Sequence, residues 1–94
     1  MNTNFMKALY LLDKNKIEEA ELCLKKAIEQ TTNTMELIQI HACSAELFYQ
    51  LGRTEESLAS IEYILKNTQN YECPEKDTAI ELKKRIEDET EGTE

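Results

Sequence analysis

Residues 15–20, Asn15-Lys16-Ile17-Glu18-Glu19-Ala20, have a related stretch 37 positions later, Gly52-Arg53-Thr54-Glu55-Glu56-Ser57. Asn and Gly most readily adopt the left-handed conformation in which helices often end. In both stretches two glutamates then open an amphipathic segment, where their charge favours the start of a helix. Each stretch therefore predicts a tight turn between two helices.

The same offset of 37 residues aligns small and large apolar positions on both sides of the turn. Small residues would let the two helices of a hairpin approach closely, and large ones would fill the space between successive hairpins. The pattern predicts an internal repeat of helical hairpins. The aligned pairs are Ala8 with Ala45, Leu11 with Phe48, Ala20 with Ser57 and Leu24 with Ile61.

Apolar periodicity along the chain predicts an all-α fold. The second and fourth helices are amphipathic, whereas the first and third are apolar on more than one face. We expect two antiparallel hairpins plus a C-terminal capping helix, in a single domain over residues 1–88 with an acidic, disordered tail over residues 89–94. Pro74 belongs to the last connection or lies just before a helix start. The expected helices are Asn4–Leu12, Ile17–Gln30, Met35–Leu51, Glu55–Asn67 and Thr78–Asp88.

The order of small, turn and large positions resembles the tetratricopeptide repeat (TPR) family over roughly Asn4–Asp88. The chain departs from that family in its repeat length of 37 rather than 34 residues and in lacking Trp. The resemblance implies right-handed stacking of the hairpins and protein binding on a concave surface. Small acidic chaperones of bacterial type III secretion, including TPR-like ones that shield needle subunits, are similar in size, charge and architecture.

The resemblance also implies which residues would form a partner-binding groove, because first-helix positions line the concave surface of TPR stacks. The alternative is that these residues close a small core or pack on the capping helix. Chaperone-binding TPR domains use Lys and Asn at the positions of Phe5 and Leu9, so we expect no binding of their acidic C-terminal motif. The groove residues are Phe5, Leu9, Leu12, Ala42, Glu46 and Tyr49, extended by Ile80 and Lys83.

The 94 residues include 11 basic and 19 acidic side chains, a formal charge of −8. This charge opposes binding to nucleic acid or to an anionic membrane. It favours a protein or peptide partner whose apolar helix is flanked by basic residues. The three cysteines are widely spaced and odd in number, and the N-terminus lacks the order of a signal peptide, so we expect reduced thiols and a cytoplasmic protein.

No catalytic arrangement is evident in the sequence, and we expect neither a metal nor a cofactor. The single His41 excludes multi-histidine metal sites, and Cys43 lies about 200° away from it around a helix. We therefore expect a non-catalytic protein-interaction module, an adaptor or small chaperone. The alternatives are a self-associating structural protein, which would form a homodimer, and a regulatory peptide sensor.

Overall fold

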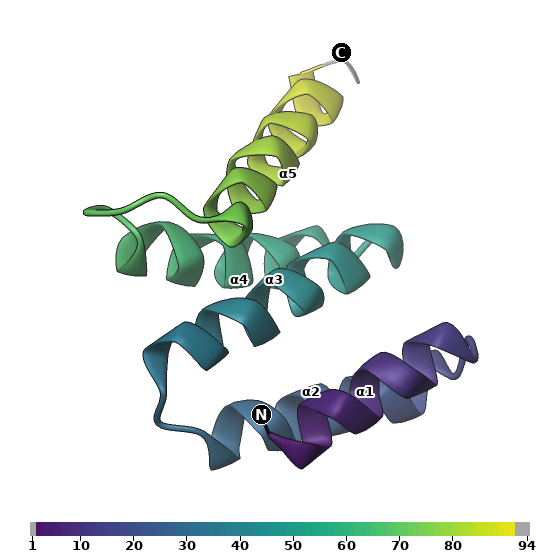
Figure 1. The fold of residues 1–94 in the computed structure, drawn as a ribbon. Helices are drawn as coiled ribbons and strands as arrows, with labels where there is room; N and C mark the ends of the chain where they lie inside the picture. The colour runs from purple at the N-terminus through teal and green to yellow at the C-terminus, as the bar shows by residue number, and fades with distance from the viewer. Residues whose placement is uncertain (1, 92–94) are drawn as a thin grey trace. The chain divides into compact units, whose positions relative to one another are not determined.

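The computed structural model describes residues 2–91, which form five α-helices and no β-strand (Figure 1). The all-α prediction is confirmed, and the first four helices begin and end within one residue of the predicted bounds. Among the described residues, none of the helices combines the length and the apolar character needed to cross a bilayer. The helices are α1 (Thr3–Asp13), α2 (Ile17–Gln30), α3 (Thr34–Gln50), α4 (Thr54–Asn67) and α5 (Pro74–Glu91).

The fifth helix is longer than predicted at both ends. Pro74 is its first residue, a position that Pro favours because its missing N–H has no helical partner there. The Cys73 carbonyl accepts the first helical hydrogen bond, from Lys76 N at 3.1 Å. At the other end α5 continues to Glu91, so residues 89–91, which we expected in the acidic tail, are helical. Residues 92–94 lie outside the described part of the chain.

The chain divides into two compact units, residues 1–40 and 41–94. The first unit contains α1, α2 and the beginning of α3. The second contains the remainder of α3, together with α4 and α5. Because the division falls inside α3, each unit is described separately.

Both hairpin turns have the geometry that the sequence predicted. Asn15 and Gly52 have positive φ angles of 60° and 76°, the left-handed conformation that ends a helix. In each turn the amide of the next residue donates to a carbonyl five positions earlier, as in a Schellman motif. These bonds join Lys16 N to Leu11 O and Arg53 N to Phe48 O, both at 2.8 Å. The two turns are therefore structural copies, 37 residues apart.

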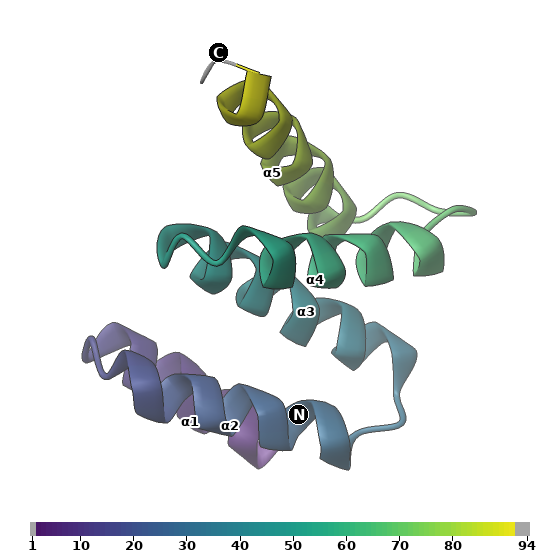
Figure 2. The same ribbon diagram turned by 180° about the vertical axis from the view of Figure 1, so that it is seen from behind.

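Hydrogen bonds at the helix starts hold the first unit together. Asn2 caps α1, its side-chain oxygen accepting the amide hydrogens of Asn4 and Phe5. The Asn2 side chain also donates to Ala27 O at the end of α2, so α1 and α2 run antiparallel (Figure 2). The backbone N–H of Asn2 donates to the Glu36 carboxylate at 2.9 Å, and this bond lowers the pKa of the Glu36 carboxyl.

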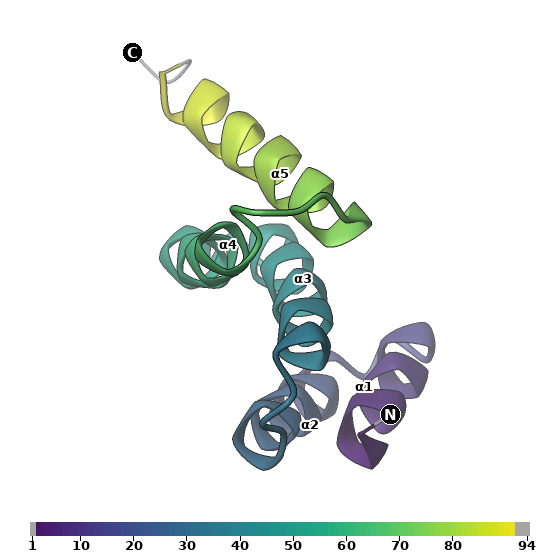
Figure 3. The ribbon, with the colours of Figure 1, turned by 60° about the vertical axis from the view of Figure 1, so that its left-hand side comes forward.

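Small residues bring α3 and α4 close together in the second unit. Ser57 and Ala45 are both fully buried, and the Ser57 hydroxyl donates to Ala45 O at 2.8 Å. His41, earlier in α3, contacts Ser60, later in α4, so the two helices are antiparallel. α5 packs against α4 (Figure 3), and its buried apolar residues are Ala79, Leu82 and Ile86.

Candidate functional site

The outward face of α1 carries three large apolar side chains that solvent reaches. Met6, Leu9 and Tyr10 are 56%, 43% and 61% exposed. Their spacing of three and four residues makes them neighbours on one face of the helix. The other side of α1 is already buried, through Phe5, Ala8 and Leu11. We call Met6, Leu9 and Tyr10 the α1 stripe.

The charges beside the α1 stripe are mainly basic. Lys7 on α1 and Lys14 directly after it are exposed, together with the single carboxylate of Asp13. The Lys14 ammonium lies 5.6 Å from the centre of the Tyr10 ring, within the range of a cation–π contact. The acidic excess of the protein lies elsewhere: residues 1–40 contain five basic and six acidic side chains, whereas residues 41–94 contain six and thirteen.

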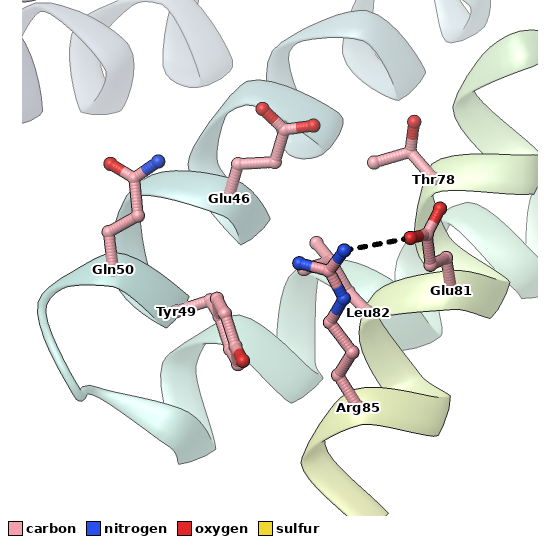
Figure 4. Close-up of a pocket in the computed structure, with 7 residues that line it drawn as sticks. All are labelled: Glu46, Tyr49, Gln50, Thr78, Glu81, Leu82 and Arg85. Atoms are coloured by element: carbon pink, nitrogen blue, oxygen red, sulfur yellow. Dashed lines mark hydrogen bonds and ion pairs between the residues drawn. The ribbon is translucent and has the colours of Figure 1, made fainter.

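A cavity of about 350 Å³ lies between α3 and α5 in the second unit (Figure 4). Its lining combines carboxylates, an aromatic ring, an aliphatic side chain and an arginine. The Arg85 guanidinium is paired with Glu81 at 2.9 Å, one turn earlier on α5. We call this space the α3–α5 cavity. It is lined by Glu46, Tyr49 and Gln50 from α3 and by Thr78, Glu81, Leu82 and Arg85 from α5.

Hydrogen bonding, burial and charge shift the pKa values of two residues of α3. The Tyr49 hydroxyl donates to the Glu89 carboxylate, which raises the pKa of Tyr49 because the bond stabilises the protonated phenol. Burial, and to a smaller extent the charge of Glu46, raise the pKa of Cys43 to about 11. The Cys43 thiol is therefore protonated at neutral pH, and a thiol is a poor nucleophile.

The structure places the predicted groove residues in different environments. Glu46 and Tyr49 line the α3–α5 cavity, and Leu9 belongs to the α1 stripe. Phe5, in contrast, is only 5% exposed, so it is a core residue and offers no surface to a partner. Leu12 and Ala42 are half-buried.

The two predicted residues of α5 lie away from the α3–α5 cavity. Lys83 lies on the side of α5 that faces α4, with its ammonium 3.6 Å from the Glu62 carboxylate. Ile80 is 50% exposed and lies about 200° around the helix from Leu82. The cavity instead uses Glu81 and Arg85, whose spacing of four residues is typical of a helix ion pair and was the available sequence signal.

Met6 and Tyr10 were also missed by sequence reasoning. They are three residues before and one residue after Leu9, a spacing that places all three on one helix face. The signal was present, but α1 is apolar on nearly every side. The sequence therefore did not show which side would be covered.

His41 is half-buried between α3 and α4. Its Nδ1 lies 3.2 Å from the Ser60 hydroxyl, and its ring stacks on Tyr63 with the ring centres 4.3 Å apart. Burial lowers the pKa of His41, because the charged imidazolium loses solvation. The contact therefore joins α3 to α4.

This environment predicts a pH dependence of stability. The folded protein favours the neutral form of His41. The contribution of this residue to the free energy of unfolding is therefore complete above the ordinary pKa of 6.5 and is lost as the pH falls below that value. We expect the stability advantage of the wild type over His41→Phe to shrink between about pH 7.5 and 5.5. Urea denaturation followed by circular dichroism measures it. A constant difference at both pH values would contradict the prediction.

Comparisons with protein-family models, with curated proteins and with solved structures return no match. Within residues 2–91, no group of three or more His, Cys, Asp or Glu side chains is arranged to hold a metal ion. The function proposed next therefore depends on the surfaces of the chain itself.

Proposed function

We propose that the protein is a non-catalytic interaction module, an adaptor or small chaperone, that binds an amphipathic helix of a partner protein through the α1 stripe. The observation that carries this proposal is the exposure of Met6, Leu9 and Tyr10 on a helix whose opposite side already fills the core. Adjacent exposed apolar side chains with helical spacing are the usual anchors for a partner helix.

The charges around the α1 stripe specify the chemistry of the partner. Lys7 and Lys14 border the stripe, so acidic residues beside the apolar face of the partner helix would meet opposite charge. The basic-flanked partner inferred from the total charge of −8 is replaced here by an acidic-flanked one, because most of the acidic excess belongs to residues 41–94.

The TPR resemblance supports the chaperone form of this proposal, because TPR-like secretion chaperones shield needle subunits. In this form the protein would act in the cytoplasm, holding a partner whose apolar helix is otherwise exposed. A partner of this kind would cover the α1 stripe without requiring any chemistry from the protein.

The test uses two synthetic helical peptides with the same apolar face, one flanked by Glu and the other by Lys. We expect the Glu-flanked peptide to bind more tightly. Leu9→Glu should weaken its binding at least about tenfold, because binding would bury an unpaired carboxylate. Helicity should remain nearly unchanged, since Leu9 is substantially exposed. Fluorescence titration measures binding, and circular dichroism measures helicity.

Ile80→Glu is the matched control, because it adds the same charge at another exposed apolar residue, on α5. It should leave peptide binding unchanged. An equal loss in both variants, or tighter binding of the Lys-flanked peptide, would contradict the proposal. Unfolding of Leu9→Glu would show that this side of α1 belongs to the core.

Self-association is the second candidate, favoured by the near balance of charge in residues 1–40, which lets two copies approach without strong repulsion. Sedimentation velocity at several protein concentrations tests it. A dimer that Leu9→Glu dissociates would show that a second copy covers the α1 stripe. Binding to anionic vesicles would instead identify a lipid surface. Either result would overturn the proposed helical partner.

A further inference from the structure

We propose that the α3–α5 cavity binds the guanidinium group of an arginine side chain presented by a peptide or protein. This site is separate from the α1 stripe, since all its residues belong to the second unit. The inference goes beyond the proposed function, because it assigns a second binding site with a ligand of different chemistry.

The charges of the cavity leave one carboxylate uncompensated. Glu81 is paired with Arg85, whereas Glu46, which is exposed to solvent, forms no ion pair in the described part of the chain (Figure 4). The cavity lining thus contains two carboxylates and one cation. A third carboxylate, that of Glu89, accepts a hydrogen bond from the Tyr49 hydroxyl. The surrounding unit adds a long-range negative potential, with thirteen acidic and six basic side chains in residues 41–94. Such a potential concentrates cations at the site.

The uncharged lining suits the remainder of an arginine side chain. Leu82 is a buried aliphatic residue at the cavity wall, against which the methylene groups of a long cationic side chain pack favourably. The hydroxyl of the half-buried Tyr49 already interacts with Glu89 and Arg85, so an added guanidinium would stack on the face of the ring. The oxygens of Gln50 and Thr78 can accept further N–H hydrogen bonds.

Arginine fits these groups better than lysine does. A guanidinium is planar, so it can stack on Tyr49 while donating two parallel hydrogen bonds to the Glu46 carboxylate. It has five N–H donors, enough to satisfy the amide and hydroxyl oxygens as well. A lysine ammonium is a compact, strongly hydrated charge that neither stacks nor donates in parallel.

The probe is the peptide acetyl-Gly-Arg-Gly-amide, titrated into ¹⁵N-labelled full-length protein and followed by amide chemical shifts. We expect weak but saturable binding, with shifts at Tyr49 and Leu82. The same peptide with citrulline in place of Arg, which keeps the shape but has no charge, should bind at least about threefold more weakly. The lysine peptide should also bind more weakly.

Glu46→Gln should reduce the affinity for the arginine peptide at least about threefold, because it removes the uncompensated charge and preserves the side-chain shape. Glu55→Gln is the matched control: Glu55 is an exposed carboxylate of the same unit, in the first turn of α4 and outside the cavity lining. It should leave the affinity nearly unchanged. Tyr49→Leu, which removes the stacking surface, should weaken binding independently of the charge.

Three results would overturn the inference. Shifts that do not saturate, or equal binding of the citrulline peptide, would show that no guanidinium site exists. Equal losses in Glu46→Gln and Glu55→Gln would show attraction to the whole acidic unit rather than to the cavity. Failure of the helical peptides at the α1 stripe would leave this inference intact, since the probes and residues of the two experiments differ.

Discussion

Ile61→Ala is expected to lower the free energy of unfolding by about 2–5 kcal/mol. Ile61 is fully buried in α4, at one of the large positions of the internal repeat. The substitution removes three carbon atoms from water-excluded packing and leaves a cavity that neighbouring side chains fill only in part. Because small domains are stable by only about 5–15 kcal/mol, this single change would remove a large share of the free energy of unfolding. Urea denaturation followed by far-UV circular dichroism measures the loss.

Ile80→Ala is the control for this prediction, since Ile80 is exposed on α5. It should change the free energy of unfolding by no more than about 0.5 kcal/mol. Equal effects of the two substitutions would mean that α4 does not bury Ile61 as the structure shows.

Ala20→Leu is expected to destabilise the protein by about 1–3 kcal/mol through overpacking. Ala20 is fully buried in α2, three residues after the helix begins and directly beyond the Asn15 turn. Its counterpart Ser57 reaches the backbone of the neighbouring helix with a short side chain, which indicates how closely the two helices of a hairpin approach. A leucine in this position would force the helices apart or adopt a strained rotamer. Thermal unfolding measures the resulting decrease.

The matched control is Ala59→Leu, which makes the same change at an exposed alanine of α4. Its effect should remain within about 0.5 kcal/mol. An unchanged or raised melting temperature for Ala20→Leu would show that this position has room for a larger side chain. The close approach predicted from the repeat would then be wrong for the first hairpin.

Local signals were sufficient to predict most helix boundaries. The ends of α1 and α3 depend on Asn15 and Gly52, whose left-handed backbone is favoured by the residue type alone. The offset of 37 residues between these turns was also visible, because it requires only a comparison of the chain with itself. The start of α5 was predicted too late, since Pro occurs both in loops and at the first helical position.

Helix formation in this chain follows from interactions between residues a few positions apart, so turn residues, dipole-matched glutamates and apolar spacing were enough to predict five helices. Burial depends instead on which side of each helix a neighbour covers. Phe5 and Leu9 are both large and apolar on α1, yet one is in the core and the other is in solvent. In the same way, Glu46 and Arg85 line one cavity only because folding brings α3 and α5 together. Contacts between residues far apart in the sequence follow from the packing of the helices, which composition and periodicity do not specify.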